Sequence, residues 1–582
     1  MKKSLFFGLI SLVILASAVS AQLTTDWQVF ANGVNVKDSP APVFLLGQEN
    51  TIRLDFTAVN SSSNVQIIVE WSNSQNQTGF GLETSPFNIV RGMNYSRLMP
   101  FETFSSLVPE GKYLMRISIR NLQGTSDNKE IVTFFQSPRI PIYGCGDLNI
   151  TDAYYVLKKD IKAEDRCFTI NAQLVKLDLN LHKVIGAQRG DGVLSNNLYY
   201  IAVKNGEISN FSHGISIWNG QYHEISNMLM NHNQGSGISI SGGGSHIIKN
   251  SAIKNVGYSH DGVTMYGSSN NLIINDTFYH NGEGIYIEEG ENNTIQGSRI
   301  VNGDIGVSFF SSANNNIINT ILDNGLNLKL SGLSEDNRCN HVLTNVSDLN
   351  GRPILLYNSR VNLTNEEVNE LVLCNADESS FDNIRILNTG NYNNGLHVFR
   401  TENTLLSNIF INNTFRLYID KSSNITITNL RSNNNHYGLK IGRSFNISLL
   451  NSVISNNRRG GVVLENVYGF IFTGNYVRFN SQFGILMDDG VTQGLIYNNF
   501  FHNILNLAVY NGEINQNSWN VTLQQGYNIL KSPYLGGNFW ADMNGTGFSE
   551  TCADTNYDGI CDQPYLIDAN NTDYLSLTNP LI

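Results

Sequence analysis

The sequence predicts an all-β protein in which a β-sandwich module precedes a parallel β-solenoid. From about residue 145 to 535, a Gly followed by a β-branched residue or Leu recurs about every 22 residues. Only 15% of the residues are charged, below the ~25% of typical globular domains, whereas Gly numbers 51. Amphipathic helices need charged side chains on their solvated faces, so this composition favours strands over helices.

The first 21 residues have the pattern of a secretory leader. Lys2 and Lys3 precede an apolar run over residues 5–18, and Val19 and Ala21 supply small residues before a cleavage site after position 21. This order is typical of a signal peptide. The apolar run is shorter than the ~20 residues of a membrane span, which disfavours an N-terminal anchor. We therefore expect an exported chain, secreted or held at the cell surface, with no transmembrane span in the mature protein.

The charge balance disfavours nucleic acid as a partner. Lys and Arg total 37 and Asp and Glu total 49, which gives a net charge of −12. Loss of the two leader lysines changes this to −14. No basic patch stands out along the sequence, and such a patch is the usual mark of a nucleic-acid binder.

Residues 22–140 are predicted to form an immunoglobulin-like β-sandwich. Apolar and polar residues alternate at 52–56, 65–69, 113–119 and 131–135, as in strands with one buried face. Turns rich in Asn, Ser and Gly separate these segments. Prolines at 138 and 141 mark the linker that follows.

Residues 141–535 are predicted to form the solenoid, whose rungs stack to share one core. The repeated position, here called the anchor, falls at Gly192, Gly214, Gly237, Gly262, Gly284, Gly306 and Gly325, and then at Gly395, Arg416, Gly438, Gly461, Gly484 and Asn506. Gly and Asn tolerate left-handed backbone dihedrals, so a corner repeated on every rung explains their abundance. Asn side chains are also expected to form ladders between rungs.

These repeats resemble the right-handed parallel β-helix of pectate-lyase-like proteins, and in particular the NosD-type proteins of microbial surfaces and periplasms. Segments between 145 and 180 resemble the N-terminal cap of such helices, 351–354 with 371–374 their insertion (about 335–375), and 536–574 their C-terminal segment. The resemblance implies a right-handed parallel β-helix and brings an association with copper. We do not expect copper, because soft-metal sites need clustered Met, Cys and His, and the 9 Met and 11 His are scattered.

Six cysteines fall into three local pairs. The pairs are Cys145 with Cys167, Cys339 with Cys374, and Cys552 with Cys561. An even number in an exported chain indicates disulfides, and although six cysteines allow 15 pairings, pairing between neighbours is the simplest. Free buried thiols are the alternative. Zinc is not expected, because no CxxC motif or paired His accompanies the cysteines.

The end of the chain, residues 536–582, is predicted to cap the solenoid with a calcium-loop-like motif. Its ligands follow the alternate spacing of calcium loops: Asp554, Asn556, Asp558, the carbonyl of Ile560, and Asp562. Tyr565 stands where such loops place a bidentate acid. We expect the calcium to be structural, because metal binding would stabilise the cap. The alternative is a metal-free Asp/Asn/Gly turn.

The outer face of the first rungs is the candidate binding surface. Counting from the anchors brings Trp218, Tyr266 and Glu288 into one column and places Tyr286 in another. Aromatic faces pack on the C–H faces of sugars, while acids and hydroxyls bind their OH groups, so these four residues are the predicted carbohydrate contacts.

Asp261, Glu283 and His260 are the candidate catalytic residues on the same face. Asp261 and Glu283 each precede an anchor on adjacent rungs, and His260 is the neighbour of Asp261. Two carboxylates about 5 Å apart suit retaining glycoside hydrolysis. A His with acids would instead suit proton abstraction in a lyase or an epimerase. The residue patterns of the resembling family's lyases and galacturonases are not matched.

These observations favour an exported cell-surface protein that binds extracellular or cell-wall polysaccharide through the first half of the solenoid. One alternative is a polysaccharide lyase, epimerase or glycoside hydrolase acting through the same face. Another is a structural envelope or adhesion protein without catalytic activity. The sequence leaves the enzyme question open and favours a non-catalytic role. Asn-x-Ser/Thr sequons are frequent, Asn60 and Asn412 among them, so some are expected to carry glycans.

Overall fold

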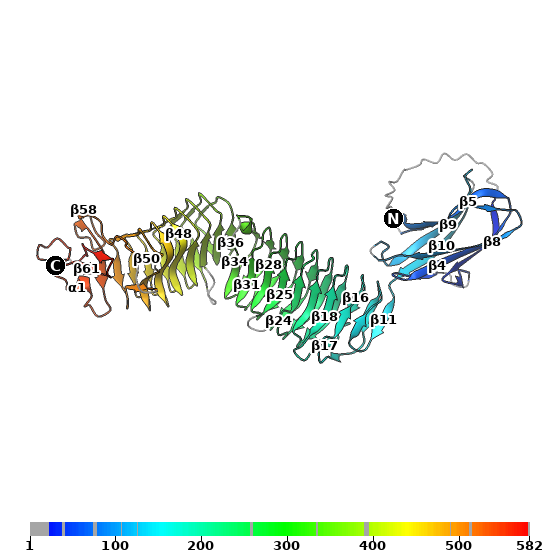
Figure 1. Cartoon of the computed structure of the whole chain (residues 1–582), viewed down its shortest axis with the longest axis horizontal. Coiled ribbons are helices and arrows are strands. Elements are labelled where there is room, and N and C mark those ends of the chain that lie inside the picture. Colours follow the sequence, from blue (N-terminus) through cyan, green and yellow to red (C-terminus); the bar gives the residue numbers. More distant parts are fainter. Residues whose placement is uncertain are drawn as a thin grey trace. The chain divides into compact units, whose positions relative to one another are not determined.

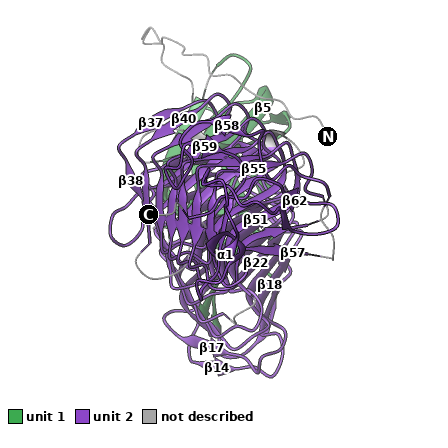
Figure 2. Cartoon of the chain, turned by 90° about the vertical axis from the view of Figure 1, so that its left-hand side faces the viewer, with its two compact units in different colours: residues 1–141, 149–156, 172–176 green, residues 142–148, 157–171, 177–582 purple. Residues whose placement is uncertain are grey.

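A computed structural model describes residues 22–37, 41–73, 78–105, 107–124, 126–256, 260–332, 336–388, 395–488, 490–510 and 515–579. The predicted leader, residues 1–21, lies outside the described residues. The chain divides into two compact units (Figure 2). Unit 1 holds the residues up to Pro141 together with Asn149–Val156 and Ala172–Lys176. Unit 2 holds Ile142–Leu148, Leu157–Asn171 and Leu177–Ile582.

Unit 1 contains two mainly antiparallel sheets around one core. One sheet has the order β2 (Val34–Asn35), β1 (Thr24–Ala31), β4 (Glu49–Ala58), β8 (Asn94–Glu102). The other has the order β3 (Val43–Leu45), β10 (Ser126–Gln136), β9 (Gly111–Arg120), β5 (Ser62–Ser72), β6 (Thr78–Glu83), and β7 (Phe87–Ile89) pairs with β5. The four predicted strands lie within β4, β5, β9 and β10. Trp71, Phe44 and Phe135 are fully buried between the sheets, with ring centroids 5.6–5.9 Å apart.

Unit 2 is a parallel β-solenoid built as two stacks, drawn from cyan through green to orange in Figure 1. The first-stack front sheet runs β12 (Gly146–Leu148), β15 (Phe168–Ile170), β18 (Asp191–Asn196), β20 (His213–Trp218), β22 (Ile238–Ser241), β25 (Asp261–Tyr266), β28 (Glu283–Glu288), β31 (Ile305–Phe310), β34 (Leu326–Ser331). The second-stack front sheet runs β36 (Ile354–Tyr357), β39 (Glu370–Cys374), β42 (Gly395–Phe399), β45 (Arg416–Asp420), β48 (Tyr437–Phe445), β51 (Gly460–Tyr468), β54 (Phe483–Met487), β57 (Leu507–Val509).

Further parallel strands, most of them three residues long, form the remaining faces of each rung. In the first stack these include β19 (Ala202–Ser209), β21 (Glu224–Asn231), β23 (Ile247–Lys249), β26 (Leu272–Ile274), β29 (Thr294–Gln296), β32 (Asn316–Ile318) and β35 (Val342–Thr344). In the second stack one face runs from β37 (Asn362–Thr364) to β55 (Leu495–Tyr497) and another from β38 (Glu367–Val368) to β56 (Phe500–His502) and β60 (Phe539–Ala541). Many of the three-residue strands turn one apolar side chain inward, and Ile427, Leu449 and Phe472 belong to the resulting core.

Glycine is required at the anchors because adjacent rungs are crowded there. The sequence had suggested a different reason, namely left-handed backbone dihedrals at the corners. A Cβ atom on any of nine of them would lie 2.5–2.8 Å from the carbonyl oxygen of the next anchor: Gly192, Gly214, Gly237, Gly262, Gly284, Gly306, Gly438, Gly461 and Gly484. No side chain fits at that distance from a backbone atom. The anchor assigned to Gly325 is wrong, because Ile305 pairs with Leu326 and Gly306 therefore faces Asn327.

Asparagine has the two roles that the sequence predicts for it. At the corners, residues such as Asn275, Asn319 and Asn446 have φ between 49° and 57°. Inside the second stack, buried asparagines form ladders in which the backbone N–H of Asn457 donates to Oδ1 of Asn480, and that of Asn480 to Oδ1 of Asn503, at 3.1 and 3.0 Å. Each amide thus satisfies a buried backbone group on the preceding rung.

Histidines occupy part of the corresponding ladder in the first stack. The backbone N–H of His223 donates to Nδ1 of His246 at 3.2 Å, and that of His246 donates to Oδ1 of Asn271 at 2.9 Å. Burial lowers the pKa of His223 to about 3 and that of His246 to about 4. Both imidazoles are therefore neutral at neutral pH and serve as ladder members in place of Asn.

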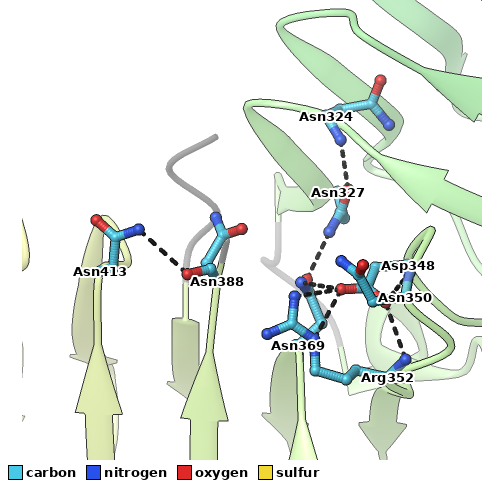
Figure 3. A network of polar contacts seen from close by, with 8 residues as sticks. All are labelled: Asn324, Asn327, Asp348, Asn350, Arg352, Asn369, Asn388 and Asn413. Atoms are coloured by element: carbon cyan, nitrogen blue, oxygen red, sulfur yellow. Dashed lines mark hydrogen bonds and ion pairs between the residues drawn. The ribbon is translucent and has the colours of Figure 1, made fainter. Parts of the chain in front are cut away.

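The two stacks are joined through a buried polar network (Figure 3). Asn327, just inside β34, donates from Nδ2 to Oδ1 of Asn369 at 2.8 Å. Asn369 donates to Oδ2 of Asp348 at 3.0 Å, and Arg352 binds the same carboxylate from Nε and Nη2 at 2.9 and 2.6 Å. The two hydrogen bonds from Arg352 neutralise the buried Asp348 carboxylate, so the polar groups that join the two stacks are paired with one another.

The three predicted cysteine pairs are confirmed as disulfides. Cys145 bonds to Cys167 in the first rungs, and Cys339, at the end of the short 3₁₀ helix η1 (Asp336–Cys339), bonds to Cys374 of β39. Cys552 and Cys561 form the third bond, next to helix α1 (Phe548–Thr551). Disulfides of this kind are typical of chains that fold in an oxidising compartment.

Candidate functional site

The front face of β18–β31 brings the predicted site residues together in register. Asp261 pairs with Glu283, and Thr264 with Tyr286, between β25 and β28. Tyr266 pairs with Glu288 in the same two strands. The predicted columns therefore exist, with neighbouring members about 4.8 Å apart, the spacing of paired strands.

One column of this face is aromatic and exposed. On successive strands this column consists of Trp218, Ser241, Tyr266, Glu288 and Phe310, each paired in register with the next. Side-chain exposure is 55% for Trp218, 45% for Tyr266 and 38% for Phe310. The three rings stand on alternate rungs, so flat apolar faces recur at about 10 Å along the stack.

Polar groups lie both in this column, at Glu288, and in the column beside it, at Tyr286. Tyr286 donates its hydroxyl to Oε2 of Glu288 at 2.7 Å, and its ring meets that of Tyr266 edge to face with centroids 5.8 Å apart. Burial, and then the hydrogen bond to the Glu288 carboxylate, raise the pKa of Tyr286. Tyr266, Tyr286 and Glu288 thus form one connected surface, and Trp218 lies two rungs away from Tyr266 in the same column.

Asp261 and Glu283 form an acidic pair at the start of their strands. Thr264 donates its hydroxyl to Oδ2 of Asp261 at 2.9 Å, and Lys329 binds Oε1 of Glu283 at 3.0 Å. Oε2 of Glu283 is buried without a hydrogen-bond partner among the described residues. Burial, and then the charge of Glu283, raise the pKa of Asp261 to about 6. The Asp261 carboxyl is thus half protonated near pH 6, while its neighbour is paired with an ammonium.

His260 is exposed beside Asp261. Within the described part of the chain, no hydrogen bond connects its ring to either carboxylate.

A second polar group lies on the same face, around Asp191 of β18. The Asp191 carboxylate accepts a hydrogen bond from Ser216 at 2.7 Å and lies 3.3 Å from Nδ1 of His213. Arg166 lies 3.5 Å from the other Asp191 oxygen. Burial opposes the charge of Asp191, but the His213 and Ser216 contacts hold its pKa below the usual value.

The predicted calcium loop is closed by its own hydrogen bonds. The Asp554 carboxylate accepts the backbone N–H groups of Asp558 and Gly559 at 3.1 and 2.9 Å. Asp562 accepts that of Thr555 at 3.1 Å, and Asn556 donates to Asp558 at 3.0 Å. Ile560 is buried, and its backbone N–H donates to Asp558. Across the described ranges, no three His, Cys, Asp or Glu side chains converge as metal ligands.

Two family models match the solenoid. Residues 191–346 match the right-handed β-helix region, and residues 340–545 match the periplasmic copper-binding protein NosD. With the parallel stacking, these matches establish a right-handed parallel β-helix. All six cysteines are in disulfides, and within the described residues no three His, Cys, Asp or Glu side chains lie together as a metal-ligand group. In the described part of the chain, no helix has the length and apolar character of a membrane span.

Several solved structures resemble the chain at low identity. The catalytic domain of a GH87 α-1,3-glucanase variant, bound to tetrasaccharides, is 12% identical over 84% of this chain and 97% of its own, with a TM-score of 0.27. A family 28 exopolygalacturonase of Yersinia enterocolitica is 10% identical over 70% and 95%, with a TM-score of 0.24. The AlgE6 A-module of a mannuronan C-5 epimerase from Azotobacter vinelandii is 13% identical over 64% and 89%, with a TM-score of 0.23. No curated protein matches the chain.

Proposed function

We propose that this β-helix chain is an exported cell-surface or secreted protein that binds extracellular or cell-wall polysaccharide along the front face of β20–β31. The single observation that carries the proposal is the exposed column of Trp218, Tyr266 and Phe310 beside the bonded Tyr286–Glu288 pair. A regular solenoid presents such a column at a constant spacing, which suits a ligand that is itself a repeating chain. Unit 1 is proposed to be an immunoglobulin-like accessory module.

The proposal is tested by removing two of the rings. Trp218→Ala with Tyr266→Ala is expected to weaken glycan binding at least tenfold, because each ring loses its packing on a sugar face, worth about 1 kcal/mol beyond area burial. A glycan array identifies the ligand, and isothermal titration measures the loss. Tyr527→Ala, which removes an 82% exposed ring elsewhere, is the matched control and should bind as wild type. Unchanged affinity in the double variant would refute the proposal.

A second function, acid–base catalysis on a polysaccharide, is favoured by the raised pKa of Asp261 next to Glu283. If Asp261 is the general acid, turnover should fall as pH rises through about 6, because the carboxyl then loses its proton. Asp261→Asn with Glu283→Gln should lower product release by about a hundredfold or more while binding persists. Product release that is equal in wild type and variant would exclude this role.

Calcium is proposed as a structural ion of the C-terminal cap, held by Asp554, Asn556, Asp558, the Ile560 carbonyl and Asp562. Addition of EDTA is then expected to lower the melting temperature by several degrees, since the metal binds only the folded cap. The matched variant Asp554→Asn with Asp558→Asn should melt at one temperature with and without EDTA. If EDTA leaves the wild-type melting temperature unchanged and elemental analysis finds no calcium, the proposal fails.

A further inference from the structure

Two adjoining cavities lie where the first stack meets the second. Their volumes are about 730 and 530 Å³, and both are lined by Leu326 of β34 and Arg416 of β45. Together they form one depression, here called the junction groove, to which both front sheets contribute. Trp218, Tyr266 and Phe310 are not among its lining residues, although Ser311, the neighbour of Phe310, is one of them.

The junction groove is strongly basic in a chain whose net charge is −12. Its basic lining residues are Lys329, Arg400, Arg416, Lys421, Arg443, Arg458 and Arg459. Among the described residues, the acids that line the same cavities are Asp304 and Asp420, and Lys329 is paired with Glu283, which does not line them. Asp420 is already bound by Arg443, through Nε at 2.9 Å and Nη2 at 2.5 Å. Positive charge therefore exceeds negative charge on the groove wall.

Two buried side-chain nitrogens of residues on this wall lack hydrogen-bond partners within the described chain. His397 is only 6% exposed, lines the groove, and its Nε2 has no hydrogen-bond partner. The buried Nε of Arg416 also has none. Buried polar groups are almost always hydrogen-bonded, because an unsatisfied one costs about 1–3 kcal/mol.

The same wall carries aromatic rings. The Arg416 guanidinium lies 4.4 Å from the centroid of Tyr418 and 4.8 Å from that of Phe415. His397 meets Tyr418 edge to face with centroids 5.8 Å apart. The rings hold the guanidinium in place, and they offer apolar faces next to a cation. This combination suits a ligand that joins anionic groups to flat apolar faces.

We propose that the junction groove binds an anionic polysaccharide, a sugar chain that bears carboxylate or sulfate groups. The planar fork of Arg pairs with such anions through two parallel hydrogen bonds, which Lys does not provide. The inference deepens the proposed function, on which it rests for the class of ligand. It assigns the charged groups of the ligand to a second site, apart from the aromatic column.

The test measures binding to three probes: polygalacturonate for carboxylate, heparin for sulfate, and dextran as a neutral chain. Arg416→Gln with Arg459→Gln is expected to weaken binding of at least one anionic probe tenfold or more at low salt, since two charged contacts are lost. Lys421→Gln with Arg459→Gln changes two exposed side chains, so it repeats the test without disturbing buried packing. Arg431→Gln with Arg478→Gln, on β47 (Arg431–Asn433) and β53 (Tyr476–Arg478), removes equal charge elsewhere and should bind as wild type.

The outcomes separate this inference from the proposed function. Loss of anionic binding in the groove variants, with loss of neutral binding only in the Trp218→Ala, Tyr266→Ala variant, supports both. Preference for heparin or polygalacturonate identifies the anionic group. Equal binding of dextran and the anionic probes would overturn the inference, as would groove variants that retain full anionic binding. Tighter competition by DNA than by either anionic sugar would likewise overturn it.

Discussion

Replacing Asn499 with Ala is expected to lower the free energy of unfolding of the solenoid by about 3–5 kcal/mol, because several buried groups lose partners together. The Asn499 amide donates to the carbonyls of Phe472 and Tyr497 and to Oδ1 of Asn538, at 2.7–2.9 Å. Its Oδ1 accepts both the backbone and side-chain N–H of Asn475 at 3.0 Å. Urea unfolding followed by circular dichroism measures the change.

Asn362→Ala is the matched control for Asn499→Ala. Asn362 stands in β37 but is exposed, so water replaces any hydrogen bonds that are lost with its side-chain amide. Its substitution should change the free energy of unfolding by no more than about 0.5 kcal/mol. If the two variants unfold at the same urea concentration, the buried ladder does not hold the rungs together.

Gly284→Ala is expected to cost about 3 kcal/mol of folding free energy, an unusual penalty for adding one methyl group. The new Cβ would lie 2.6 Å from the carbonyl oxygen of Gly306 and 2.3 Å from Cγ2 of Ile300. The carbonyl belongs to the next rung and cannot retreat without opening the sheet. Thermal unfolding and urea titration report the loss.

The control for Gly284→Ala is Gly144→Ala, where nothing lies within 4 Å of the added atom. This variant should remain within about 0.5 kcal/mol of wild type. A Gly284→Ala protein as stable as the Gly144→Ala protein would show that the anchor glycines are not required by crowding between rungs.

Much of the fold follows from the 22-residue period. In a parallel solenoid, residues at equal phase lie on adjacent rungs, so counting from the anchors places Asp261 beside Glu283 and Tyr266 beside Glu288. The period also predicts the Asn ladders, because a repeated buried turn needs the same amide each time. The cysteine pairs follow from their local spacing.

The remaining features depend on contacts that the period does not encode. The repeat becomes irregular at the end of the first stack. There the sequence predicted an anchor at Gly325, whereas the structure has Asn327 at that position of the rung. The junction groove joins Lys329 to Arg416 and Arg459, residues far apart in sequence and spread among acids, so no basic patch is visible along the chain. The reason for the anchor glycines is a carbonyl of the next rung, which only the stacked structure places.

Protection of Trp218 and Tyr266 from hydroxyl-radical oxidation, with and without bound glycan, tests the proposed function most directly. Trp218 is 55% exposed, whereas Trp71, Trp519 and Trp540 are buried and serve as internal references. Polysaccharide binding along the front face predicts that both rings become protected while the exposed Tyr527 stays reactive. Bound glycan that leaves the oxidation of Trp218 and Tyr266 unchanged would contradict the assignment of this face as the binding surface.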